Sequence, residues 1–361
     1  MNRKLASLAA VLVGAVVTGT ACDALPQYTI RDLGRVENTT TYAWGINNLG
    51  QVVGEVALRY AVVWNPDGTR TDIPELSGAL WSTAFSINDS GWVACNSATN
   101  SGGYGIAYVW AGGDTVYPIE PLSGYSYSTA YDINNSGLAV GGSINPGLTS
   151  TTSAFKWSLS DGVVKLGPLP SYADTDAHGV NDLGQVVGRS HTSAGYGSSR
   201  ACMWDAEGNV HDIGVLTGRD AMAQSINNRG QVVGSSTYSR SDWSHAFLWT
   251  SDAGMTDLGT LCGGYSQATD INNSGLVVGD SATGTLFEAK AFVWTSDTAM
   301  VPLPNLPGGR VGHASSVNDA GVIAGYAYDA SEKVHAVVWE PIPEPASFIA
   351  LAIGLASIGC M

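Results

Sequence analysis

Short apolar stretches separated by glycine-containing turns recur along most of the chain. The pattern Ala-x-x-(Ile/Val)-Asn-x-x-Gly-x-(Val/Ala) occurs seven times, with its asparagines at Asn47, Asn88, Asn134, Asn181, Asn227, Asn272 and Asn318. These asparagines are spaced by 41, 46, 47, 46, 45 and 46 residues. Such a regular period predicts one closed array of repeated units rather than separate domains.

Each repeat divides into four short segments of strand-like composition. In the fifth repeat these segments are residues 223–227, 231–234, 245–249 and 255–259. The first two are joined by the Asn-Asn-Arg-Gly sequence of residues 227–230. Asn tolerates left-handed backbone angles and Gly adopts them readily, so we expect a tight hairpin turn there. The four segments therefore predict four antiparallel strands per repeat.

The third segment of every repeat ends in tryptophan, at Trp64, Trp110, Trp157, Trp204, Trp249, Trp294 and Trp339. Seven units of four antiparallel strands predict an all-β fold, a seven-bladed β-propeller. A β-solenoid has a shorter coil and does not need four strands in each unit.

The two ends of the repeat region complement each other. Residues 28–34 form a lone fourth segment before the first repeat, whereas no fourth segment follows Trp339. We predict that the N-terminal strand completes the last blade, because a ring closed in this way has no free sheet edge.

Composition narrows the possible classes of protein. Charged residues make up 13% of the 361 residues, and 45 residues are glycine, which suits short strands and turns and not a helical bundle. The formal net charge of -15 would repel a phosphate backbone, so we expect no nucleic-acid partner.

The third segment resembles a known bacterial repeat. Residues 245–249 (His-Ala-Phe-Leu-Trp) and, more loosely, residues 335–339 (His-Ala-Val-Val-Trp) are similar to the HAF repeat of bacterial extracellular proteins. The resemblance covers residues 28–339 and implies secretion and a repeat architecture, with no established activity. Five repeats lack the histidine and have instead Tyr60, Ile106, Ser153, Arg200 and Lys290, so these positions are not a ligand set.

Residues 1–24 have the layout of a secretory signal peptide. Arg3 and Lys4 precede an apolar run over residues 5–17, and small residues occupy positions 19–21. Lipidation at Cys22 is the alternative, since residues 18–22 resemble a bacterial lipobox, although Gly19 stands where that box carries an aliphatic residue. The propeller is then expected over residues 25–341.

Residues 342–361 resemble a PEP-CTERM sorting tail. The Pro-Glu-Pro sequence of residues 343–345 precedes sixteen uncharged residues. The resemblance implies a sorting transpeptidase as a partner, and membrane contact only through the targeting segments. The stretch ends in Gly359-Cys360-Met361 instead of the family's basic cluster, and is shorter than the roughly 20 residues of a spanning helix, so an apolar terminal helix is the alternative.

Cys22 and Cys360 belong to the targeting ends, which leaves Cys95, Cys202 and Cys262 in the repeats. Three cysteines at non-equivalent positions predict neither a disulfide framework nor a metal site. We expect buried or free thiols.

No motif for catalysis or for a cofactor is found. The seven asparagine turns lack the alternating carboxylates and closing acid of a calcium loop, having Asp89, Asp182 and Asp319 alone at their second position. No His-x-x-x-His pair or Gly-x-Ser-x-Gly elbow occurs. His178 and His313 follow or precede the repeated alanine and are candidates to face the central channel, although we expect surface or hydrogen-bonded histidines. A metal and a cofactor are therefore not expected.

Paired carboxylates for glycan cleavage can come from distant blades. Asp174, Asp176, Asp220 and Asp242 are candidate loop acids that could converge, and ordinary solvated charges are the simpler interpretation.

Strand alternation sorts the loops onto two faces. The short asparagine turns share one face, and the long, variable loops share the other with the links between blades. Variable loops on a rigid scaffold commonly bind ligands, and these contain the candidate ligand-binding aromatics Trp81, Tyr127, Tyr172, Tyr196 and Trp243. Packing of these rings on blade edges is the alternative.

These observations predict a non-catalytic binding or structural protein, secreted to the bacterial cell surface or extracellular matrix. Its expected partner is an extracellular glycan or a surface protein. The alternative is a polysaccharide-acting hydrolase or lyase on a propeller scaffold. An acid pair within catalytic reach in the axial funnel would favour the enzyme, whereas a funnel of Ala, Ser and Gly would favour the binder.

Overall fold

The computed structural model describes residues 28–35, 39–57, 59–99, 104–146, 151–192, 198–238, 243–284 and 288–342. The predicted signal peptide and the sorting tail beyond Ile342 lie outside the described residues, and so do Cys22, Tyr196, Asp242 and Cys360. Within the described ranges, no helix is long and apolar enough to cross a membrane.

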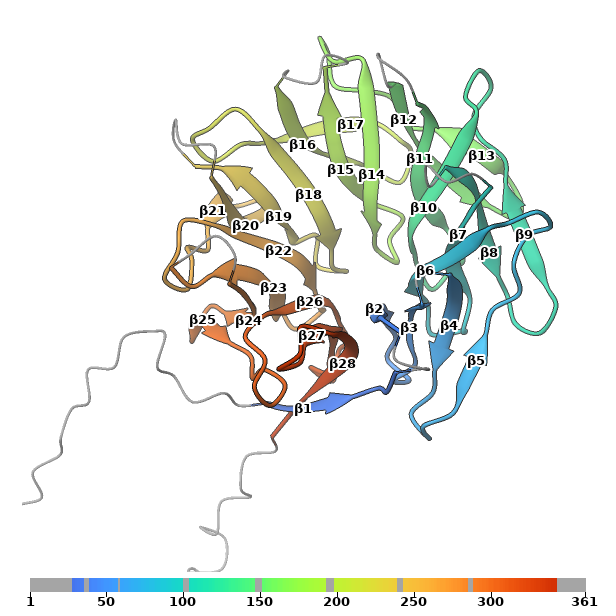
Figure 1. Ribbon diagram of the computed structural model, residues 1–361. Coiled ribbons are helices and arrows are strands. Elements are labelled where there is room, and N and C mark those ends of the chain that lie inside the picture. Colours follow the sequence, from blue (N-terminus) through green and yellow to red (C-terminus); the bar gives the residue numbers. More distant parts are fainter. Residues whose placement is uncertain are drawn as a thin grey trace, which may run out of the picture.

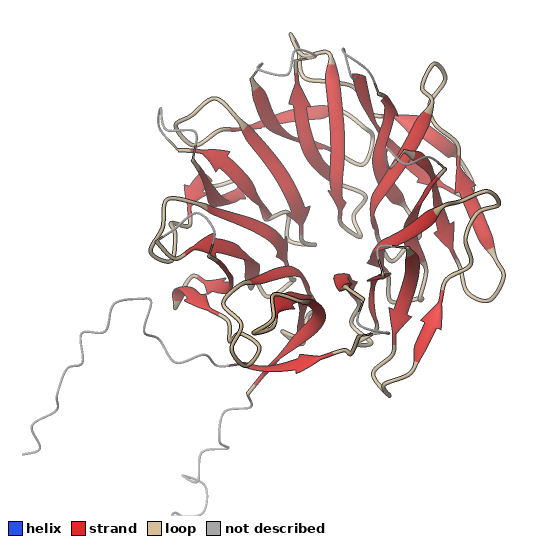
Figure 2. Ribbon diagram, in the orientation of Figure 1, coloured by secondary structure: helices blue, strands red, loops and turns tan. Residues whose placement is uncertain are grey.

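Seven four-stranded antiparallel sheets surround a central axis (Figure 1). The described part of the chain consists of strands and loops without helices (Figure 2). The predicted all-β, seven-bladed propeller with four strands in each blade is confirmed.

The first strand of each blade lies innermost and the second lies beside it (Figure 1). The innermost strands are β2 (Thr41–Ile46), β6 (Trp81–Ile87), β10 (Tyr127–Ile133), β14 (Asp174–Val180), β18 (Ala221–Ile226), β22 (Ser266–Ile271) and β26 (Gly312–Val317). The second strands are β3 (Val52–Val56), β7 (Val93–Ala98), β11 (Ala139–Asn145), β15 (Val186–His191), β19 (Val232–Thr237), β23 (Val277–Ala282) and β27 (Ile323–Tyr328).

The third and fourth strands complete each blade toward the outside. The third strands are β4 (Tyr60–Trp64), β8 (Gly105–Trp110), β12 (Thr151–Ser158), β16 (Ser199–Trp204), β20 (Ser244–Thr250), β24 (Ala289–Thr295) and β28 (Val334–Pro341). The outer strands are β5 (Arg70–Asp72), β9 (Val116–Ile119), β13 (Gly162–Lys165), β17 (Val210–Gly214), β21 (Gly254–Asp257), β25 (Ala299–Pro302) and β1 (Tyr28–Asp32). In the fifth repeat all four predicted segments are strands, and β19 runs three residues further than expected.

The N-terminal strand closes the ring as predicted. Strand β1 pairs antiparallel with β28, with Tyr28 opposite Pro341 and Asp32 opposite Val337. An ion pair between Arg31 and Glu340 (2.9 Å) adds to this contact. The outer edge of the seventh blade is therefore covered by the other end of the chain.

The core lies between neighbouring blades, and the repeated residues build it. Two of the third-strand tryptophans, Trp204 and Trp339, are fully buried. The Nε1–H of Trp339 donates a hydrogen bond to Pro304 O (2.8 Å). The repeated alanine of the third strand donates a backbone hydrogen bond to a serine or threonine at the start of the next blade, as Ala107 N does to Ser128 Oγ (2.9 Å). These repeated contacts hold each blade to the next.

Candidate functional site

The seven asparagine turns form a closed ring of hydrogen bonds on one face. Each Nδ2 donates to the backbone carbonyl of the equivalent asparagine in the next blade, as Asn134 does to Asn181 O (2.8 Å). The ring closes where Asn318 donates to Asn47 O (3.1 Å), across the junction of the last and first blades. All seven donors are buried asparagines. The ring thus ties every blade to both neighbours.

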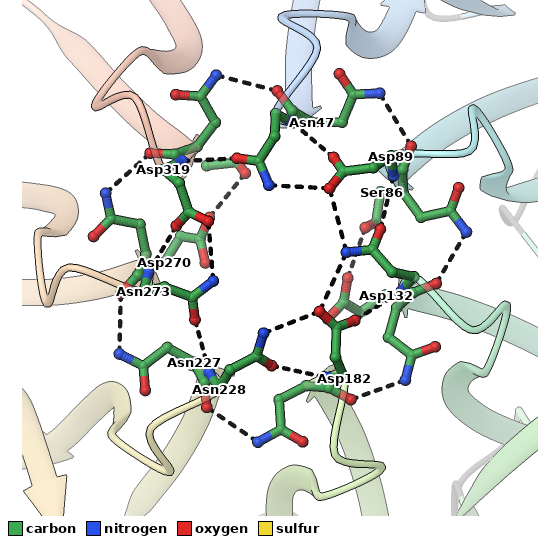
Figure 3. A pocket seen from close by; sticks show the side chains of 18 of the residues that line it. Asn47, Ser86, Asp89, Asp132, Asp182, Asn227, Asn228, Asp270, Asn273 and Asp319 are labelled. Carbon is green, nitrogen blue, oxygen red and sulfur yellow. Dashed lines mark hydrogen bonds between the residues drawn. The ribbon is translucent and has the colours of Figure 1, made fainter.

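A second ring uses the next residue of each turn (Figure 3). Each backbone N–H donates to the side-chain oxygen of the equivalent residue one blade further, from Asn48 N to Asp89 Oδ1 (2.8 Å) round to Asp319 N to Asn48 Oδ1 (2.9 Å). No two aspartates are neighbours in this ring, so an asparagine Nδ2 can donate to a carboxylate, as Asn228 does to Asp182 (2.9 Å).

These rings correct the explanation of the turns. Gly230 has the expected positive φ of 74°, but the turn asparagines do not have positive φ. Asn227 instead accepts the backbone N–H groups of Arg229 and Gln231 with Oδ1 while Nδ2 joins the inter-blade ring. Backbone demands alone therefore do not explain the repeated asparagine. Among the described residues, no group of three or more His, Cys, Asp or Glu side chains is placed to hold a metal.

An axial cavity of about 230 Å³ lies inside the ring of innermost strands. Its lining comes from the two variable positions of the Ala-x-x-(Ile/Val) pattern. The first of these positions supplies Trp44, Phe85, Tyr131, His178, Gln224, Thr269 and Ser315, and the second supplies Gly45, Ser86, Asp132, Ser225, Asp270 and Ser316.

A β-bulge explains why two adjacent residues face the same cavity. In every innermost strand the register shifts at the residue after the repeated alanine, for example between Ala43 and Gly45. All seven blades share this shift. Side chains normally alternate between faces in a strand, and a bulge re-aims one of them. Both variable positions therefore reach the channel in every repeat except the fourth, where the second position is Gly179.

The cavity has an aromatic side and a polar side. The rings of Trp44, Phe85, Tyr131 and His178 line the aromatic side. They continue a chain of neighbouring rings that begins outside the cavity lining with His313, Tyr326 and Tyr42, with successive centroids 4.7 to 6.1 Å apart. The other side carries Gln224, Thr269 and Ser315. An apolar surface facing a few polar groups is the usual composition of a small-molecule site.

Two polar atoms in the cavity lining have no hydrogen-bond partner in the described structure. They are Nε1 of Trp44 and Nε2 of His178, and both atoms are buried. Buried polar groups are normally paired, so such atoms need an explanation. Burial lowers the pKa of His178 to about 4, which keeps its ring neutral at pH 7. The expectation that the histidines are hydrogen-bonded is therefore wrong for His178, whereas its place in the channel is confirmed.

Two carboxylates lie at the bottom of the cavity, where it meets the asparagine rings (Figure 3). Asp270 accepts four hydrogen bonds, from Ser225 Oγ, Ile271 N, Ser316 Oγ and Val317 N. Both carboxylate oxygens of Asp270 are therefore fully hydrogen-bonded to groups from three blades.

Asp132 has a similar position but one bond fewer. It accepts from Ser86 Oγ (2.6 Å), Ile133 N (2.9 Å) and Val180 N (2.9 Å). Burial raises the pKa of Asp132 to about 6, and the charge of Asp270 contributes to the rise. Asp132 and Asp270 are thus carboxylates of the axial channel that the sequence analysis did not single out.

Of the loop acids named from the sequence, the three in the described residues, Asp174, Asp176 and Asp220, have separate partners. Asp174 and Asp176 lie within strand β14 and are not loop residues. Asp176 pairs with Arg189 (3.0 Å) and His191 (3.1 Å). Burial by itself would raise the pKa of Asp176, but these partners hold the pKa below its usual range. Asp220 instead accepts the backbone N–H of Ser199 (2.8 Å).

The rim aromatics, which are the candidate ligand-binding rings on the long-loop face, lie apart from the cavity lining in the four described cases, Trp81, Tyr127, Tyr172 and Trp243. Trp81 and Tyr127 begin the innermost strands β6 and β10, and Tyr127 stacks on Tyr104 with centroids 5.5 Å apart. Tyr172 packs against a buried cluster, which agrees with the packing alternative for that ring. Trp243 is 37% exposed.

Of the three cysteines in the repeats, Cys95 and Cys202 are buried free thiols, as expected. Burial raises the pKa of both thiols, so neither is a reactive nucleophile. Cys262 is exposed and disulfide-bonded, so the expectation of a thiol is wrong there.

A sequence signal for the cavity did exist. Two variable positions stand inside an otherwise nearly constant motif, and the first of them changes from aromatic residues in the first three repeats to polar residues in the last three. The signal was hidden because strand alternation predicts opposite faces for adjacent residues.

Comparison with known proteins supports the fold and no more. No family model matches the sequence, and no curated protein is similar to it. A virginiamycin B lyase from Staphylococcus aureus has a similar structure, with a TM-score of 0.52 at 9% identity over 86% of this chain and 99% of the other. A puromycin hydrolase has a TM-score of 0.56 at 12% identity over 84% of this chain and 52% of the other. At such identities the likeness shows a shared propeller scaffold.

Proposed function

We propose that this chain is a non-catalytic binding protein of the bacterial cell surface or extracellular matrix, and that it holds one sugar unit of an extracellular glycan in the axial cavity. The two-sided lining of the cavity carries the proposal. One face of a sugar ring presents C–H groups that stack on aromatic rings such as Trp44 and Tyr131, while its hydroxyls suit Gln224, Thr269 and Ser315.

The size of the cavity limits the ligand. Sites for drug-sized molecules have volumes of roughly 300–1,000 Å³, and this cavity has about 230 Å³. It therefore suits a single ring, such as the terminal unit of a glycan chain.

The state of the carboxylates supports binding over catalysis. A catalytic acid or nucleophile must reach the substrate with an available oxygen. Asp270 has both oxygens engaged by the frame, and Asp132 has one acceptor position left. The raised pKa of Asp132 is the one feature that favours the alternative, a polysaccharide-acting hydrolase or lyase. Release of reducing ends from a bound polysaccharide by the purified protein would support that alternative.

The proposed location rests on the targeting segments. The signal-like residues 1–24 and the resemblance to HAF repeats support secretion, and the tail of residues 342–361 supports sorting by a transpeptidase. A surface protein that contacts the rim aromatics is the second kind of partner consistent with exposed rings on the long-loop face.

A glycan array on the purified propeller tests the proposal. Trp44→Ala and Tyr131→Ala should each weaken binding of a selected glycan by about 2 kcal/mol, because each removes a stacking surface from the cavity. Trp243→Ala is the matched control on the rim. Binding that survives both cavity variants and is lost in Trp243→Ala would move the site to the long-loop rim. An array without any bound glycan would contradict the proposed function.

A further inference from the structure

We infer that the axial cavity selects a cationic amino sugar, with the ammonium group of the sugar against Asp132 and its ring against the aromatic side. This inference rests on the proposed function and adds the chemical class of the ligand.

The charge of the channel is the first observation. Asp89, Asp132, Asp182, Asp270 and Asp319 line it along its length. No lysine or arginine lines either end of the described channel. Five carboxylates without a cation create a negative potential in a partly enclosed space, which attracts a cationic ligand and repels an acidic one.

A cation that influences His178 does not change this balance. Arg189 influences His178 electrostatically, but its guanidinium is paired with Asp176 (3.0 Å) beside the cavity. The charge of Arg189 is therefore largely neutralised by Asp176 and adds little positive potential in the channel.

Asp132 has an acceptor position that its counterpart lacks. In Asp270 the Oδ2 atom accepts from both Ser316 Oγ and Val317 N, whereas in Asp132 the Oδ2 atom accepts from Val180 N alone. The difference arises because blade four has Gly179 where blade seven has Ser316. A Cβ at Gly179 would lie 2.7 Å from Gln224 O, so no larger side chain fits there. The remaining lone pair of Asp132 suits a ligand N–H.

The unpartnered atoms at the cavity wall indicate a ligand with several polar groups. Trp44 Nε1–H needs an acceptor, which a sugar hydroxyl supplies. His178 Nε2 also lacks a partner, and its ring lines the cavity next to Tyr131. A simple quaternary ammonium group would leave both atoms unpaired, whereas a hydroxylated amine satisfies them and keeps the cation–π attraction of the rings.

The experiment compares three β-1,4-linked disaccharides that differ only at C2: glucose, N-acetylglucosamine and glucosamine. Isothermal titration with the full propeller at pH 7 should show at least tenfold tighter binding of the glucosamine disaccharide than of the glucose disaccharide. N-acetylglucosamine, which is neutral, should bind no better than glucose.

A charge variant locates the preference. Asp132→Asn should reduce the preference for glucosamine over glucose to less than threefold. Glu207→Gln is the matched control, because it removes the same charge from an exposed turn that lines neither end of the channel. If Asp132→Asn does not fold, the pH dependence of the wild-type protein serves instead.

The pH dependence follows from Asp132 and the groups that face it. Asp132 must be ionised to hold an ammonium group, so the preference for glucosamine should fall as the pH drops through about 6. Asp270 and His178 face the same cavity, with Asp89 and Asp182 further along the channel. His178 stays neutral in this range because burial lowers its pKa to about 4.

The outcomes separate the two proposals. Equal binding of all three disaccharides, or a preference unaffected by Asp132→Asn, overturns the amino-sugar inference and leaves a glycan-binding function. No binding of any sugar, here and on the array, overturns the proposed function itself.

Discussion

Replacing Asn134 by alanine should destabilise the propeller by about 2–4 kcal/mol. The side chain is 5% exposed and makes three hydrogen bonds to the backbone. Its Nδ2 donates to Asn181 O (2.8 Å), and its Oδ1 accepts from Ser136 N (3.0 Å) and Leu138 N (2.9 Å). Each bond contributes about 0.5–1.5 kcal/mol, and an unpaired buried partner adds to the loss.

The neighbouring residue is a built-in control. Asn135 also bonds to the adjacent blades, but it is exposed. Its Oδ1 accepts from Asp89 N (2.8 Å), and its Nδ2 donates to the carboxylates of Asp89 (3.3 Å) and Asp182 (3.2 Å). Water can replace these partners, so Asn135→Ala should cost less than about 1 kcal/mol.

Urea unfolding followed by tryptophan fluorescence measures the difference, provided that the denaturant slope is unchanged. The folded fraction of Asn134→Ala should bind its ligand with wild-type affinity, since Asn134 joins neighbouring blades and does not line the axial cavity. Equal losses for Asn134→Ala and Asn135→Ala would refute the view that the buried inner ring joins the blades.

Three further predictions concern closure, the bulge and pH. Starting the mature chain at residue 35 removes β1, and the midpoint of thermal unfolding should fall by many degrees or the protein should aggregate through the bare edge of β28; an unchanged midpoint would show that β1 is not the closing strand. Gly45→Ala places a Cβ 2.7 Å from Phe85 O and should cost about 1–3 kcal/mol, whereas Gly142→Ala meets nothing closer than 3.7 Å and should be nearly neutral in the same assay. The pKa of His178 is about 4 in the folded protein and near 6.5 in the unfolded chain. The stability of the wild type relative to His178→Gln should therefore rise by up to about 3 kcal/mol as the pH increases from 4 to 6.5. A stability difference that does not vary with pH would contradict the buried, neutral imidazole.

The repeat determined the architecture without help from the structure. The asparagine spacing, the four segments and the spare segment at residues 28–34 were enough to predict the blade number and the closing strand. These features depend on local periodicity and on the order of segments along the chain, both of which can be counted directly.

The site depended on contacts that no single repeat contains. Asn47 and Asn318 meet only because seven blades close into a ring, so the inter-blade role of the asparagines could not be inferred from one turn. Trp44 and Gly45 face one cavity only because a bulge breaks strand alternation. Asp132 and Asp270 come from blades three and six, and their separation in sequence hides their shared channel. The sequence therefore determined the strands and their order, whereas ring closure and the bulge decided which side chains meet at the axis.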